Sequence, residues 1–124
     1  MLAGMHNSLT LAGLLATEVA LATDLEGVTV ARFRLVVHSR RWDRTGNCWV
    51  NSPPTVVTVA CSRRLAENAA ASLRRGDPVV VAGRLRVHRS VRDQRRSQLE
   101  IEAWTVGPDL ARTTASAVRG AEAA

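Results

Sequence analysis

Arginine is the residue type in this sequence whose distribution points most directly to binding chemistry. All 17 residues counted as Lys or Arg are arginines, and most of them lie between Arg32 and Arg96. That segment carries a charge of about +11, although the whole chain of 124 residues carries +6. A guanidinium group pairs with a phosphate through two parallel hydrogen bonds and also stacks on flat rings. We therefore expect a polyanionic partner along this segment.

Two of the three tryptophans lie inside the arginine-rich segment. Trp42 follows Arg40 and Arg41 in a polar stretch that is poorly suited to core packing, and Trp49 lies further along the same stretch. Every nucleobase has a flat face on which an indole ring can stack. The two tryptophans are therefore candidates for stacking on the bases of a nucleic acid.

The third tryptophan has a different setting. Trp104 lies beside Glu100 and Glu102, whose negative charges repel phosphate. We therefore expect Trp104 to pack within the protein or to contact another subunit, with DNA binding as the alternative.

Catalytic and metal-binding chemistry find little support in the sequence. Cys48 has no histidine near it along the chain, and no Ser/His/Asp arrangement, paired-carboxylate motif or phosphate-binding glycine loop stands out. The 2 cysteines and 3 histidines lack the spacing of a zinc site. We expect no enzyme activity, no metal and no other cofactor.

Alternation of apolar and polar residues predicts five β-strands. In the second strand Arg32 and Arg34 alternate with apolar residues, and in the fourth strand Arg84 and Arg86 do the same. Each strand therefore has a buried side and a basic outer side. The predicted strands are Ser8–Val19, Val28–His38, Thr55–Ser62, Pro78–His88 and Gln98–Val106.

One helix is predicted over Arg64–Arg75, between the third and fourth strands. Leu65, Ala69 and Leu73 recur on one side and form its expected buried stripe. Gly76 follows the helix and suits a left-handed C-terminal cap.

Three strands, a helix and two strands are the connectivity of the OB-fold, and other small all-β folds remain open. The predicted fold class is all-β, a five-stranded OB-fold Greek-key barrel with one α-helix between strands 3 and 4. The long connections, Arg40–Pro54 and Arg89–Ser97, are expected to rise beside the binding face. Residues 1–110 are expected to form this domain, and residues 111–124 a short disordered tail.

The chain is expected to reside in the cytoplasm. No stretch approaches the roughly 18 apolar residues of a membrane helix, and the N-terminus does not have the pattern of a secretory signal. With 2 cysteines, a disulfide framework is not expected.

Over roughly residues 7–110 the chain resembles the bacterial single-stranded DNA-binding protein family. The helix and the strand that follows it carry the most specific part of the resemblance, and Gly107–Pro108 matches the close of the last strand. The matching segments are Asn7–Gly13, Phe33–Leu35, Ser39–Gly46, Trp49–Val50, Leu65–Asn68, Leu73–Asp77, Val79–Leu85 and Gly107–Pro108.

The resemblance implies a homotetramer of OB-folds, associated with the nucleoid, that coats single-stranded DNA during replication, recombination and repair. A dimer is the next expectation. Trp42 and Trp49 match stacking aromatics of the family, whereas Val56, Ser62 and Ser90 stand where aromatics are common. The C-terminus lacks the acidic tip of the family, which favours a short, specialised paralogue.

The expected DNA contacts combine tryptophan stacking with arginine–phosphate pairing, and simple solvation is the alternative for each arginine. They are Arg32, Arg34, Arg40, Arg41, Trp42, Trp49, Arg84, Arg86, Arg89 and Arg92. RNA remains an alternative ligand. A second alternative is a degenerate OB-fold paralogue that acts mainly in protein interactions or as a subunit of a mixed oligomer, with a principal single-stranded DNA-binding paralogue as its partner.

Overall fold

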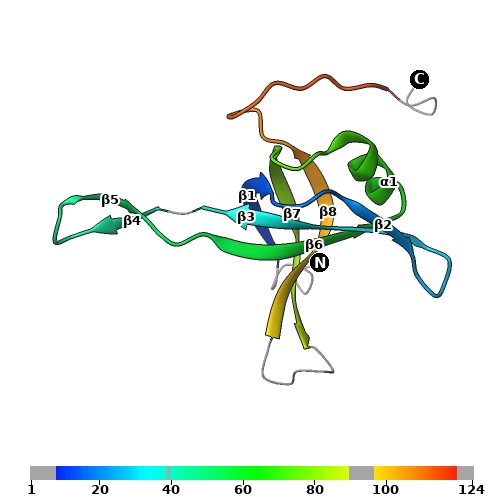
Figure 1. Ribbon diagram of the computed structural model, residues 1–124, viewed down its shortest axis with the longest axis horizontal. Helices are drawn as coiled ribbons and strands as arrows, with labels where there is room; N and C mark the ends of the chain where they lie inside the picture. The colour runs from blue at the N-terminus through cyan, green and yellow to red at the C-terminus, as the bar shows by residue number, and fades with distance from the viewer. Residues whose placement is uncertain (1–7, 39, 90–96, 120–124) are drawn as a thin grey trace.

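Five long strands close into a barrel in the computed structural model, which describes residues 8–38, 40–89 and 97–119 (Figure 1). Along the sheet, the strands follow the order β1, β7, β8, β6 and β3, and pairing between β1 and β3 closes the barrel. The pairing of β6 with β8 is parallel, while β1, β3 and β7 pair with their neighbours in antiparallel fashion. The barrel strands are β1 (Ser8–Leu15), β3 (Thr29–Val37), β6 (Thr55–Ser62), β7 (Pro78–Arg89) and β8 (Ser97–Pro108).

The inner side of the barrel holds the apolar residues that the alternation predicted. Phe33 and Leu35 of β3 are buried, and so are Val59 of β6, Val81 of β7 and Ile101 of β8. The predicted five-stranded OB-fold class is therefore confirmed. The third strand, Thr55–Ser62, matches its prediction at both ends.

The helix α1 (Arg63–Ser72) follows β6, as predicted, but it ends earlier than expected. Leu73 is in the extended conformation, and its N–H donates to the Ala69 carbonyl at 2.9 Å. The predicted continuation to Arg75 is wrong because the Asp77 side chain accepts the Arg74 N–H at 2.8 Å and fixes a turn there. Gly76 has a positive φ of 91°, but it belongs to this turn and does not cap the helix.

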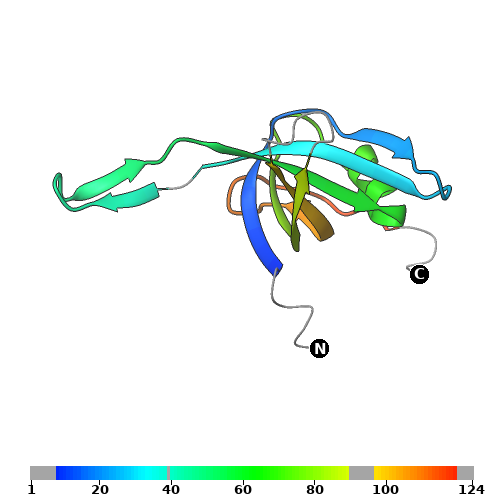
Figure 2. The same ribbon diagram turned by 90° about the horizontal axis from the view of Figure 1, so that it is seen from below.

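The region predicted as one long polar loop, Arg40–Pro54, instead contains a β-hairpin. Strands β4 (Arg40–Asp43) and β5 (Cys48–Asn51) pair in antiparallel register as a separate two-stranded sheet. A side-chain hydrogen bond from the Thr45 N–H to Asp43 Oδ1, at 3.0 Å, supports the turn between them. Figures 1 and 2 show this hairpin, here called the arm, projecting well away from the barrel.

The predicted first strand, Ser8–Val19, is also shorter in the structure. β1 ends at Leu15, and a separate strand β2 (Ala20–Thr23) pairs with β3 outside the barrel. The connection is held by the Thr17 hydroxyl, which accepts the Arg34 N–H at 3.0 Å. This bond ties the connection to β3, the strand with which β2 then pairs in the same sheet.

After β8 the chain makes one turn at Asp109, whose side chain accepts the Ala111 N–H at 3.0 Å. Residues 113–119 contain neither helix nor strand. Ser90 and Arg92, both named in the sequence analysis, lie outside the described residues. Among the described residues, no helix has the length and apolar character needed to cross a membrane.

Candidate nucleic-acid interface

The two tryptophans of the arm lie directly opposite each other. Trp42 on β4 and Trp49 on β5 are register partners, and their ring centroids are 5.5 Å apart with an interplanar angle of 75°. This edge-to-face arrangement is a favourable geometry for two aromatic rings. Trp42 remains 46% exposed and Trp49 remains 61% exposed. The arm therefore presents a preformed aromatic pair to solvent.

Arginines surround this pair at both ends of the hairpin. Arg40 is exposed at the start of β4, and Arg44 is exposed in the turn. Within the described residues, neither side chain has an ion-pair partner. Arg41 lies opposite Val50 in the backbone register. The arm thus combines rings that can stack with cations that remain available to a phosphate.

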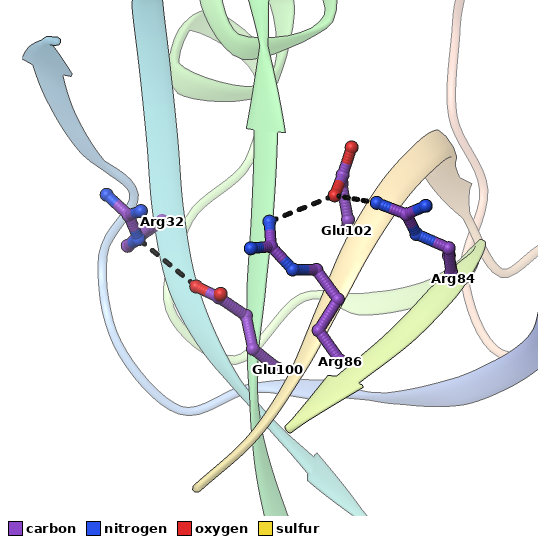
Figure 3. A network of polar contacts seen from close by, with 5 residues as sticks. All are labelled: Arg32, Arg84, Arg86, Glu100 and Glu102. Carbon is purple, nitrogen blue, oxygen red and sulfur yellow. Dashed lines mark hydrogen bonds and ion pairs between the residues drawn. The ribbon is translucent and has the colours of Figure 1, made fainter. Parts of the chain in front are cut away.

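The outer face of the barrel carries the two predicted basic rows, on β3 and on β7. Strand β8 lies next to β7, and the register sets Glu102 opposite Arg84 and Glu100 opposite Arg86. The β6 strand separates β8 from β3. Figure 3 shows that the acidic side chains project between the arginines of the two rows.

Ion pairs connect the three strands across this face. Arg84 Nη2 and Arg86 Nη1 both donate to one oxygen, Oε2 of Glu102, at 2.9 and 3.1 Å (Figure 3). Arg32 Nε donates to Oε1 of Glu100 at 3.2 Å. We call these five residues the arginine–glutamate network. Three of the four predicted arginines on this face therefore already have a carboxylate partner.

The network lowers the pKa of Glu102 below the ordinary value of 4.5. The main cause is the hydrogen bond from Arg84. Desolvation by burial is the next largest effect and raises the pKa, while the charge of Arg84 and the hydrogen bond and charge of Arg86 lower it further. Glu102 is consequently ionised at neutral pH. The ionised carboxylate of Glu102 therefore pairs with the same guanidinium groups that were predicted to bind a phosphate.

Arg34 is the remaining arginine of the predicted barrel face. It lies on β3 opposite Thr58 of β6, its side chain is exposed, and within the described residues it forms no ion pair. Arg34 and Arg40 are therefore cations of the predicted site whose described side chains have no carboxylate partner among the described residues.

A β-bulge in β8 sets the geometry beside the network. Ala82 pairs with Thr105 and Gly83 pairs with Ala103, so Trp104 has no register partner on β7. Its ring is 55% exposed and does not belong to the core. Gly83 is required for this close approach, because a Cβ there would collide with the Glu102 carbonyl oxygen and lie 2.7 Å from the Ala103 Cα. A glycine inside a strand is a known sequence signal for such a bulge.

The structure places the predicted site residues in two groups. Trp42, Trp49 and the neighbouring arginines lie on the arm, whereas the other described arginines lie on the barrel. Arg89 is the last residue of β7. Val56 and Ser62, which replace aromatics, are exposed on β6 and offer no ring for stacking.

Sequence analysis missed the pairing of Glu100 and Glu102 with the arginines. Both glutamates lie two residues apart in one strand, and that spacing places them on one side of a sheet. The sequence does not give the register of β8 against β7, and this register decides which arginine lies opposite each glutamate.

A closed five-stranded barrel with one helix and an arginine-rich outer face defines a protein of the OB-fold class. Comparison with known proteins gives the family. The model of the Single-strand binding protein family matches residues 6–108, and the chain belongs to this family. It is a family of binding proteins, which agrees with the prediction that the chain is not an enzyme.

Named relatives and solved structures support the same assignment. Single-stranded DNA-binding protein 1 of Streptomyces coelicolor is 48% identical over 94 residues, covering 75% of this chain and 60% of the relative. Single-stranded DNA-binding protein 2 of Tropheryma whipplei is 41% identical, covering 84% of this chain and 69% of the relative. This chain therefore spans only about 60% of the length of the first relative.

The crystal structure of a small single-stranded DNA-binding protein from Streptomyces coelicolor has a TM-score of 0.73 and 42% identity, and the match covers 86% of this chain and 96% of that one. The second single-stranded DNA-binding protein of Mycobacterium smegmatis has a TM-score of 0.70 and 30% identity, covering 91% of this chain and 98% of that one. At these identities both the fold and the family are shared.

Proposed function

We propose that this protein binds single-stranded DNA without sequence preference, and that the arm and the outer face of the barrel form the binding surface. The observation that carries the proposal is the exposed Trp42–Trp49 pair on an arm where Arg40 and Arg44 have no carboxylate partner within the described residues. The names of the relatives, which are single-stranded DNA-binding proteins, support the same ligand.

The chemistry of the arm favours a single strand over a duplex. Bases in a duplex are stacked on each other, so their faces are closed to an indole ring. In a single strand the faces are available, and each stacked base contributes about 1–3 kcal/mol. Arginine–phosphate contacts add affinity that does not depend on base identity. The proposed contacts are Arg32, Arg34, Arg40, Arg41, Trp42, Trp49, Arg84, Arg86, Arg89 and Arg92.

The first test is fluorescence-anisotropy binding to oligothymidine, a duplex of the same length and an RNA strand, at low and at physiological salt. We expect tightest binding to the DNA single strand, and a loss of affinity with salt at a slope of about 0.7 per neutralised phosphate. Equal affinity for the duplex would contradict the proposal. Tighter binding to the RNA strand than to the DNA strand would show that RNA is the preferred ligand.

The second test uses the tryptophans themselves. Trp42→Ala should weaken binding by about 5- to 100-fold at every base composition, because one stacking contact is lost. Trp104→Ala is the matched control, since it removes another exposed indole, from β8, and leaves the arm intact. If both variants bind like the original protein, the arm does not belong to the site.

The proposal extends to assembly and cellular role on the basis of family membership. We propose a homo-oligomer, a tetramer in the first instance and a dimer in the second, that acts on single strands in replication, recombination or repair in the cytoplasm and the nucleoid. A principal single-stranded DNA-binding paralogue is a further proposed partner. Sedimentation of the purified protein with and without that paralogue tests both proposals.

A further inference from the structure

The outer face of the barrel has an acidic centre between two basic rows. Glu100 and Glu102 of β8 pair with Arg32 of β3 and with Arg84 and Arg86 of β7. The sequence alone presents this face as strongly basic. In the folded protein much of that charge is neutralised before any ligand arrives.

The two glutamates differ in how easily they could leave their partners. The side chain of Glu100 is only 13% exposed, so its pairing with Arg32 belongs to the packed surface of the barrel. The side chain of Glu102 is 48% exposed, and those of Arg84 and Arg86 are 51% and 53% exposed. Exposed ion pairs are weak and exchange readily with solvent ions. The Glu102 pairs can therefore be broken without disturbing the core.

We propose that Glu102 is an internal competitor of DNA phosphate that limits the affinity of the β7 row for single-stranded DNA. This inference rests on the proposed function and concerns the same surface. One carboxylate oxygen holds both Arg84 and Arg86, at 2.9 and 3.1 Å, in the way that a phosphate oxygen would. A strand that reaches this row must displace Glu102 from both guanidinium groups and remain near its negative charge.

The arm and the barrel face therefore differ in whether a bound phosphate must displace an ion pair. Arg34, Arg40 and Arg44 have no carboxylate to displace among the described residues, whereas Arg84 and Arg86 bind phosphate at the expense of two ion pairs. Glu102 therefore sets how tightly the barrel face retains a strand and how readily the strand is released.

The test is the Glu102→Gln variant, which keeps the size of the side chain and removes its charge. We expect about three- to tenfold tighter binding to oligothymidine at low salt, with a salt slope steeper by about 0.7 for each additional phosphate neutralised. The gain should shrink at high salt. Glu26→Gln is the matched control, because Glu26 is exposed in the turn before β3 and has no arginine partner within the described residues. Thermal melting of each variant confirms that it is folded.

A double-mutant cycle separates competition from a simple change of net charge. Arg86→Gln should cost more affinity in the Glu102→Gln background than in the original protein, because only there is Arg86 free to meet a phosphate. Equal costs in the two backgrounds would overturn the proposal, as would a Glu102→Gln variant that binds no tighter than Glu26→Gln.

The failure of this inference is distinct from that of the proposed function. If the original protein binds oligothymidine and Glu102→Gln behaves like the control, only the competition is refuted. If the original protein does not bind a single strand at all, the proposed function itself is refuted.

Discussion

The ring of Trp42 meets the ring of Trp49 edge to face across the arm, with the centroids 5.5 Å apart. The two residues come from opposite strands of a hairpin whose strands have only 4 residues each. A cross-strand aromatic pair adds about 0.5–1.5 kcal/mol beyond the burial of its surface. In so short a hairpin, we expect this contact to stabilise the pairing of the two strands and to hold the two rings in one relative orientation.

Coupling between the two rings is the first prediction. Trp42→Ala and Trp49→Ala should weaken binding of oligothymidine non-additively, because losing either ring also releases the other from its fixed orientation. We expect the double variant to differ from the sum of the single variants by about 0.5–1.5 kcal/mol in binding free energy, measured by anisotropy titration. Additive losses would show that the rings act as independent platforms.

The strands of the barrel were predictable because their alternation is long and regular. Thr55–Ser62 was predicted to the residue, and the basic rows of β3 and β7 lie on the outer face as expected. The arm was not predicted, because strands this short carry little periodic signal and their stability depends on cross-strand contacts. The tryptophans were identified as site residues, but their pairing required the hairpin register.

The arginine–glutamate network is a second feature that could not be predicted from the sequence. The outward positions of Arg84 and Glu102 follow from alternation within their own strands. Whether they face each other depends on the length of the connection between β7 and β8 and on the bulge at Ala82–Gly83. A shift of one residue in register would place the acids on the other side of the sheet.

Acid should remove the stabilising contribution of Glu102. Its pKa is lowered in the folded protein, so the contribution is present above the unfolded value and is lost as the pH falls through the folded value. We expect the original protein to melt at a higher temperature than Glu102→Gln at neutral pH, with the difference shrinking as the pH falls below the ordinary value of 4.5 and Glu102 becomes protonated. A difference that is constant across this range would show that the ion pairs do not contribute.

Gly83→Ala should destabilise the barrel. The new Cβ would collide with the Glu102 carbonyl oxygen and the Ala103 Cα, which are backbone atoms of the neighbouring strand. We expect a loss of about 1–3 kcal/mol in the free energy of unfolding, measured by urea titration. Gly107→Ala is the matched control, since a Cβ there meets nothing within 4 Å. Equal stability of the two variants would contradict the close approach of β7 and β8.

The two cysteines should differ sharply in reactivity. Cys48 is exposed on the arm, whereas Cys61 is buried, and burial raises the pKa of the Cys61 thiol. A thiol reagent should therefore modify Cys48 rapidly in the native protein and Cys61 only after denaturant is added. Rapid reaction of both thiols without denaturant would show that the barrel opens around β6.

Replacing Arg63 by glycine should stabilise the protein. Arg63 begins α1 with a φ of 61°, in the left-handed region that costs an ordinary side chain about 1–2 kcal/mol. Glycine removes this strain but gains freedom in the unfolded chain, so we expect a net increase of about 0.5–1 kcal/mol in the free energy of unfolding. Asn47→Gly is the matched control, because Asn47 has a φ of 50° but asparagine tolerates this region better than arginine does. A larger gain at Asn47 than at Arg63 in urea titrations would show that the start of the helix is not strained.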